Sequence, residues 1–240
     1  MRLSERARLK LDSLLPAPLG YRLDLLRPLR FYGGPMNGQG ARQRLVRELM
    51  RAVAFDEIVE TGTYRGVTTT FLSDVSGLPV HTAEVSPRYV RYARVRCATH
   101  PSVTVHHRDS RDLLRELAAR PGAPTLFCYL DAHWGEDVPR HDELRIIHAR
   151  WPRAVVMIDD FQVHDDPGYA YTRYGGAPLN LDYLPELPGW RPFYPATRAA
   201  AETGDRRGCL VLATAALAPA VAALDGLRPA GRHLVPTPAT

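Results

Sequence analysis

The sequence predicts an α/β fold of the doubly wound type, in which a mostly parallel seven-stranded sheet ends in an antiparallel strand pair. Apolar runs of strand length alternate five times with segments of helical periodicity. These runs are almost continuously apolar, as expected for parallel strands that helices cover on both faces. Two further runs near the C-terminus have no long helix between them, which favours an antiparallel pair at the edge of the sheet.

The N-terminal part of the chain is rich in arginine and in turn-forming residues. We expect one or two short helices in residues 1–30, and either a lid or a surface loop at 31–40. A helix is expected at 41–54, because apolar residues that include Leu45 and Leu49 form one stripe while arginines cover the other face.

The alternation of strands and helices occupies the middle of the chain. Strands are expected at 55–60, 79–84, 103–106, 125–130, 154–158, 190–194 and 208–213, and helices at 68–75, at 87–99, after Ser110 and around 144–147. We expect residues 164–183 to form a loop. The chain is therefore divided into a basic segment or lid (1–40), a central ligand-binding domain (41–215) and a partly helical tail with a loose end (216–240).

Length and composition indicate one globular domain with a sizeable core, since 45% of the 240 residues are hydrophobic. The net charge of +5 is spread along the chain without a basic block, which argues against nucleic-acid binding. The three cysteines are widely spaced, and Cys128 and Cys209 lie in apolar runs, so we expect buried thiols in a reducing compartment. We find no signal peptide and no run long enough to span a membrane, and we expect a cytoplasmic protein.

A glycine-rich turn at residues 58–69 is the stretch around which the rest of the chain is organised. A buried strand ends in Glu60, turns at Gly62 and Gly66, and continues as a helix whose free N–H groups suit a ligand carboxylate or phosphate. A strand-to-helix turn without a ligand is the alternative. The dinucleotide pattern G-x-G-x-x-G is absent and no second domain is evident, which disfavours an NAD-dependent dehydrogenase.

The pattern Glu60-x-Gly62-x-x-x-Gly66-x-Thr68 resembles the first motif of class I S-adenosylmethionine (SAM) methyltransferases. It looks most like the version in metal-dependent small-molecule O-methyltransferases of the catechol and macrocin types. The resemblance implies a Rossmann-like sheet and a SAM-binding central domain, with the methionine part of SAM held by the acid and the turn. The residues that it assigns there are Glu60, Gly62, Thr63, Tyr64, Gly66 and Thr68.

Acids also follow the second and third strands. A carboxylate at the end of a second strand can accept both hydroxyls of a ribose, so Glu84 indicates an adenosine ligand without saying which one. Residues 83–89 resemble the second methyltransferase motif, which implies that Glu84 and Val85 contact the SAM ribose. Asp109 and Ser110 resemble the position at the adenine edge.

The fourth and fifth strands end in Asp131 and in the pair Asp159-Asp160. Adjacent strand ends lie close enough for these carboxylates to share one hard divalent ion such as Mg²⁺. Metal-dependent O-methyltransferases carry acids at the matching positions, which implies a metal set of Asp131, Asp159 and Asp160, with Asp131 also beside SAM. Capping or turn roles for these acids are the alternative.

His133 is the candidate general base, because a histidine titrates near neutrality and follows the first metal candidate by two residues. Catechol-type relatives have a lysine nearby, so the chain departs from that pattern. A fourth metal ligand and an ordinary rim histidine are the alternatives for His133. His141 and His164 are lesser candidates for the base.

Together these motifs predict a SAM-dependent and Mg²⁺-dependent O-methyltransferase that acts on a small-molecule or glycosylated hydroxyl acceptor. We expect the loop tyrosines to shape the acceptor pocket; they are Tyr169, Tyr171, Tyr174 and Tyr183. Two alternatives stay open: a metal-independent SAM N-methyltransferase, and a non-catalytic SAM-binding module that serves as a partner subunit. A homo-oligomer is possible, and the sequence does not identify the acceptor.

Overall fold

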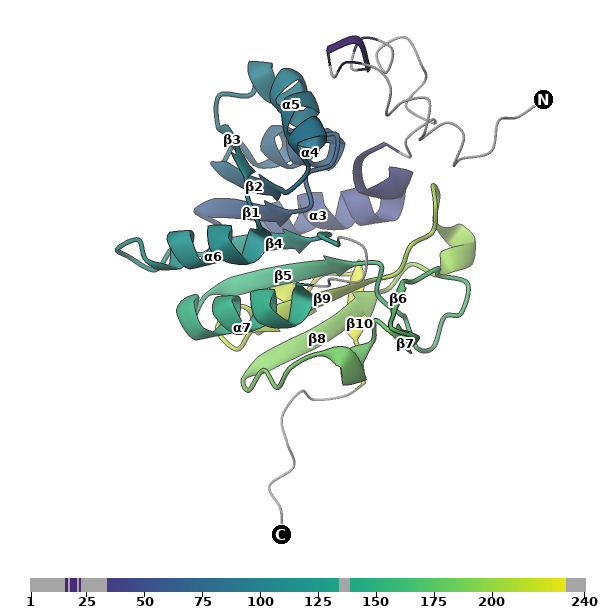
Figure 1. The fold of residues 1–240 in the computed structure, drawn as a ribbon. Coiled ribbons are helices and arrows are strands. Elements are labelled where there is room, and N and C mark those ends of the chain that lie inside the picture. The colour runs from purple at the N-terminus through teal and green to yellow at the C-terminus, as the bar shows by residue number, and fades with distance from the viewer. Residues whose placement is uncertain (1–15, 17, 21, 23–33, 134–138, 232–240) are drawn as a thin grey trace, which may run out of the picture.

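The core of the molecule is one twisted sheet, whose strands lie across the centre of Figure 1. The structure is a computed structural model that describes residues 16, 18–20, 22, 34–133 and 139–231. In these residues the sheet has eight strands in the order β10-β8-β9-β5-β4-β1-β2-β3. The strands are β1 Glu57–Thr61, β2 Val80–Glu84, β3 Val103–His107, β4 Leu126–Leu130, β5 Ala154–Asp159, β8 Trp190–Pro195, β9 Cys209–Thr214 and β10 Leu227–Pro229.

Strands β1 to β5 pair in parallel, and β9 lies antiparallel between β5 and β8. The predicted fold class and the antiparallel C-terminal pair are therefore confirmed. Because β1, β4 and β5 all run in the same direction, their carboxyl ends meet at one edge of the sheet, where ligands bind in doubly wound folds.

Helices cover both faces of the sheet because alternate strand residues point to opposite sides. Ile58 joins the cluster beneath one helical layer, and its neighbour Val59 joins the cluster beneath the other. The first layer contains α3 Gly40–Ala52, α4 Val67–Ser76 and α8 Ala218–Ala222, and the second contains α6 Ser110–Ala118 and α7 Arg140–Arg150. Helix α5 Pro87–Arg96 continues into a 3-10 turn, η3 Cys97–Thr99, and packs against β2 and β3.

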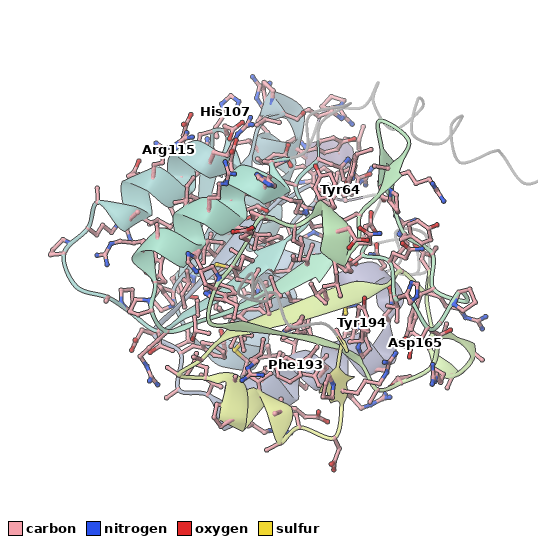
Figure 2. All side chains as sticks on the ribbon, turned by 90° about the horizontal axis from the view of Figure 1, so that it is seen from below. Tyr64, His107, Arg115, Asp165, Phe193 and Tyr194 are labelled. Atoms are coloured by element: carbon pink, nitrogen blue, oxygen red, sulfur yellow. The ribbon has the colours of Figure 1, made fainter. Side chains whose placement is uncertain are left out.

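The C-terminal tail contributes an eighth strand that the sequence did not predict. Leu227–Pro229 pairs antiparallel with β8. Arg228 of this strand forms an ion pair with Asp165 (2.6 Å), and its guanidinium lies 5.4 Å from the centre of the Tyr194 ring. Asp165 and Tyr194 accordingly lie close together in Figure 2. A three-residue strand that ends in proline has no apolar run for a sequence pattern to detect.

The loop predicted at 164–183 contains regular structure. Strands β6 Arg173–Tyr174 and β7 Ala177–Pro178 form a small hairpin, and a 3-10 turn, η4 Leu181–Tyr183, follows it. Gly175 and Gly176 both have positive φ, as a two-residue turn between antiparallel strands requires. The Gly-Gly pair is therefore a sequence signal for a β-hairpin that our prediction of a loop missed.

The N-terminal segment reaches the carboxyl edge of the sheet through a 3-10 turn, η2 Pro35–Gly38, which leads into α3. Most of the helices predicted in residues 1–30 fall outside the described residues. Cys128 and Cys209 are buried free thiols, as predicted. No helix among the described residues combines the length and the apolar character needed to cross a membrane.

Candidate functional site

The glycine turn packs directly against the end of β4. Gly62 has φ +87°, and a Cβ at this position would lie 2.7 Å from the carbonyl oxygen of Asp131. Gly66 has φ +72° and precedes α4, whose start no side chain caps. Because the first N–H groups of a helix lack partners within the helix, this turn presents hydrogen-bond donors and a positive dipole end to the crevice.

A cavity of about 120 Å³ lies at this turn. Its lining brings together many of the predicted cofactor residues; the full lining is Gly34, Met36, Asn37, Glu60, Gly62, Thr63, Tyr64, Arg65, Val67, Thr68, Tyr129 and Asp131. Larger cavities, of about 450, 430 and 190 Å³, lie beside α8, near the amino ends of the strands and beside α3. None of these three is lined by an acid predicted at a strand end, so we place the functional site at the cavity of about 120 Å³.

Met36 and Asn37 belong to this cavity but were not predicted as site residues. The Met36 N–H donates to Thr68 Oγ1 (3.0 Å), which ties the N-terminal segment to α4. Both residues have positive φ, at 52° and 58°. Backbone conformations that are unfavourable for residues other than glycine tend to cluster at ligand sites. The turn-rich composition of 31–40 was the only signal in the sequence.

Glu60 is 1% exposed and faces the cavity from the end of β1. Its Oε2 accepts hydrogen bonds from Thr69 (2.5 Å) and Thr82 (2.7 Å). Burial raises the pKa of Glu60 to about 7, and the two hydroxyl donors offset only part of this effect. A carboxyl with this pKa changes charge near neutral pH and responds strongly to a cationic ligand.

Glu84 lies at the end of β2 and its two carboxylate oxygens accept backbone hydrogen bonds. Oε2 accepts from the N–H of Tyr64, and Oε1 accepts from that of Ser86, both at 2.8 Å. Each oxygen keeps a second lone pair, so the carboxylate can still accept two ribose hydroxyls. Val85 beside it is exposed, as is Tyr64, whose ring packs on that of Tyr89 with centroids 4.5 Å apart.

Asp109 caps helix α6. Capping is the role that we gave above as the alternative to ligand binding for an acid at the end of a strand. Its Oδ1 accepts from the Arg111 N–H (2.8 Å), and the Arg111 guanidinium binds both carboxylate oxygens. These hydrogen bonds hold the pKa of Asp109 below its usual range. Ser110 is buried behind it. Contact of Asp109 and Ser110 with an adenine ring stays a prediction.

Asp159 is the last residue of β5, and Asp160 follows the strand and has different partners. Asp159 faces α3 and is fully buried. Its Oδ1 binds the Arg42 guanidinium, and its Oδ2 accepts from the Tyr129 hydroxyl (2.5 Å) and the Asn37 amide (2.9 Å). Two of these partners, Asn37 and Tyr129, line the cavity at the glycine turn.

Asp160 has φ +60° and binds donors from two loops. Its Oδ1 accepts from Arg207 Nε (2.5 Å), and its Oδ2 accepts from Thr172 Oγ1 (2.8 Å). The Arg207 hydrogen bond holds the pKa of Asp160 below its usual range against the opposing effect of burial. Asp160 is thus a paired carboxylate, like Asp159.

Asp131 lines the cavity. Burial raises its pKa well above the usual value, and the charges of Asp159 and Asp160 add to the rise. Among the described residues, no group of three His, Cys, Asp or Glu side chains is arranged to hold a metal ion. Because two of the three acids already bind arginines and hydroxyl or amide donors, the arrangement does not fit the predicted Mg²⁺.

Three residues predicted to serve the acceptor, His133, Tyr169 and Tyr174, lie in different environments. His133 is exposed just past Asp131, and residues 134–138 beyond it are not described. Tyr169 is buried in the core, where its hydroxyl donates to the Thr197 carbonyl (2.9 Å), and its place in the acceptor pocket stays a prediction. Tyr174 lies near the acids, and its buried hydroxyl has no partner among the described residues.

The fold of this chain is shared by solved structures of methyltransferases. It resembles the O-methyltransferase TomG from Streptomyces achromogenes, involved in tomaymycin synthesis and solved with SAM (20% identity, 72% of this chain and 79% of that one, TM-score 0.52). It also resembles the O-methyltransferase from Bacillus cereus with SAH (15%, 73% and 81%, 0.51) and cofactor-bound Rv0187 from MTB (18%, 90% and 99%, 0.55). No family model matches the sequence, and no curated protein matches it significantly.

These similarities confirm the resemblance to class I SAM-dependent methyltransferases at the level of the fold. The same fold occurs in MtNAS, which was solved with MTA and tNA (16% identity, 78% of this chain and 62% of that one, TM-score 0.52). The reaction must therefore be argued from the residues of the site, because a shared fold does not fix the chemistry.

Proposed function

We propose that this chain is a SAM-dependent O-methyltransferase that acts on a small-molecule hydroxyl acceptor. One observation carries the proposal: the uncapped start of α4, the buried carboxyl of Glu60 and the Asp131 carboxylate meet at one cavity beneath the glycine turn. This arrangement suits an amino acid group, whose carboxylate would bind the helix start and whose ammonium would bind Glu60. Methionine is that part of SAM.

The remaining polar groups can be assigned roles around the same ligand. Glu84 would accept the ribose hydroxyls, and Asp109 with Ser110 would lie at the adenine edge. Bound SAM supplies a methyl group on a positively charged sulfur. The residues of the chain must then hold the acceptor oxygen in line with that methyl group and take up its proton.

The acceptor side is assigned to Tyr174 and His133. The Tyr174 hydroxyl is buried without a partner among the described residues, and an acceptor polar group would satisfy it. His133 is exposed at the same strand end as Asp131 and can collect the acceptor proton as a general base. No step of this proposal passes through a metal ion, because two of the three acids predicted to bind one, Asp159 and Asp160, are already paired with arginines.

Methyl transfer from radiolabelled SAM to panels of hydroxyl and amine compounds tests the proposal. Labelled O-methyl products, lost in Glu84→Ala, are the expected result. Products labelled on nitrogen alone would favour the N-methyltransferase alternative. SAM binding without transfer to any compound would favour a non-catalytic binding module.

A further inference from the structure

Arg207 forms an ion pair with Asp160, one of the three acids of the predicted metal set. Its side chain is 28% exposed, and its Nε and Nη2 donate to Asp160 Oδ1 (2.5 Å) and Thr172 Oγ1 (2.6 Å). The hydrogen bond with Asp160 raises the pKa of Arg207, and the charges of Asp160, Asp159 and Asp131 add to the rise. The Arg207 guanidinium is therefore in direct contact with one carboxylate of the predicted metal set, that of Asp160.

The neighbouring residues hold the Arg207 backbone in place. The Gln39 side chain donates to the Arg207 carbonyl (2.9 Å) and accepts from its N–H (2.8 Å). Arg42 also donates to that carbonyl while its other nitrogen binds Asp159. Both Gln39 and Arg42 are buried. Arg207 is thus a cation fixed by buried partners, unlike a solvated surface arginine.

We propose that Arg207, supported by Arg42, serves as a built-in cation in place of a divalent metal, so that the site works without one. The inference rests on the proposed function for the position of the acceptor. The electrostatic basis of the inference does not depend on the proposed function. Three close carboxylates repel one another unless a positive charge lies near them, and here arginines of the chain supply that charge. Two guanidinium groups in direct contact with Asp159 and Asp160 also take the oxygens that a metal would need.

The consequence for the reaction concerns the acceptor proton. Without a divalent ion to acidify the hydroxyl, the proton must pass to a side chain, and turnover depends on a base such as His133. We expect methyl transfer by metal-stripped protein to continue in excess EDTA. This differs from metal-dependent O-methylation, in which chelation stops turnover.

Binding of Mn²⁺, followed by the electron paramagnetic resonance signal of the free ion, tests the inference without knowledge of the acceptor. The wild-type protein should bind no stoichiometric Mn²⁺ at millimolar concentration. Arg207→Met should bind one ion at least about tenfold more tightly than wild type, because it frees carboxylate oxygens, the ligands that such ions prefer. Adding Asp160→Asn to Arg207→Met should remove the gained site.

Arg206→Met is the matched control, since Arg206 is an exposed neighbour that donates to the Glu202 carbonyl, and it should gain no site. Two results overturn the inference: stoichiometric Mn²⁺ binding by wild type that Asp160→Asn abolishes, and a folded Arg207→Met variant that gains no Mn²⁺. Calorimetric titration with SAM on each variant reports folding of the cofactor site. SAM binding and Mn²⁺ binding are measured separately. A protein that fails to bind SAM would contradict the proposed function, whereas the Mn²⁺ results alone decide the inference about Arg207.

Discussion

At the scale of single residues, the charge of Glu60 links cofactor binding to pH. Its pKa is raised to about 7 by burial, so the folded protein holds this proton more tightly than the unfolded chain. The resulting contribution to stability is complete at low pH, below the unfolded pKa, and is lost as pH rises through 7. A ligand ammonium favours the ionised form, so SAM binding should release a proton.

We therefore expect SAM affinity to fall roughly 20-fold when the pH is lowered from about 7.5 to about 5.5. Calorimetry in buffers of different ionisation enthalpy measures both the affinity and the released proton. Glu60→Gln should bind SAM more weakly and without this pH dependence. If Glu60→Gln kept the full pH dependence, Glu60 would not be the linked group.

The ion pair of Arg42 with Asp159 is a second residue-scale feature, because both side chains are almost completely buried. Arg42→Met should lower the free energy of unfolding by about 3–5 kcal/mol, since it leaves a buried carboxylate without its cation. Urea denaturation measures the change. Arg44→Met, an exposed neighbour on the same helix, should change stability by less than about 0.5 kcal/mol. Equal effects of the two substitutions would contradict the role of the pair.

At the scale of elements, the turn between β1 and α4 must approach the end of β4 closely. Gly62→Ala should destabilise the fold by about 1–3 kcal/mol and weaken SAM binding, because the new methyl group would overlap the Asp131 backbone. Gly77→Ala is the control: Gly77 also has positive φ, but a Cβ there meets open space. We expect Gly77→Ala to keep full SAM affinity in calorimetric titration. Similar SAM affinities for both variants would argue against close packing of the turn as a binding requirement.

The β6–β7 hairpin carries the tyrosine that we assign to the acceptor. Tyr174→Phe should raise the KM for the acceptor about 5- to 20-fold through loss of a hydrogen bond, and should leave SAM affinity unchanged. Tyr171 was also predicted for the acceptor pocket, but its partly exposed ring lies against Arg173, so we expect Tyr171→Phe to change neither value. Steady-state kinetics with an acceptor found in the labelled-SAM screen would measure both. If Tyr174→Phe weakened acceptor binding and SAM binding to the same extent, the assignment of Tyr174 to the acceptor pocket would be wrong.

The sequence predicted most elements because their signals are local. Strand ends such as Glu60 and Glu84 follow from short apolar runs that stop at an acid. Arg207 binds Asp160, 47 residues away, and Arg42 binds Asp159, 117 residues away, so no local pattern could reveal these pairs. A partial signal existed for Arg42, which lies three and four residues before Leu45 and Val46. It therefore shares the apolar stripe of α3, whereas we had placed the arginines on the other face.

At the scale of the whole molecule, parallel strands bring the glycine turn, Glu84 and the paired acids to one edge of the sheet. The fold is similar to that of solved O-methyltransferases that contain SAM or SAH. The central claim is that this edge binds SAM in preference to other adenosine ligands.

Calorimetric titration of the purified protein with SAM, S-adenosylhomocysteine and NAD, with and without Mg²⁺, tests that claim most directly. We predict one site for SAM and S-adenosylhomocysteine, no site for NAD, and the same affinities with and without Mg²⁺. Glu84→Ala should weaken SAM binding by about 1–3 kcal/mol, because the ribose hydroxyls lose their acceptor. Absence of SAM and S-adenosylhomocysteine binding at millimolar ligand, or tighter binding of NAD, would contradict the account.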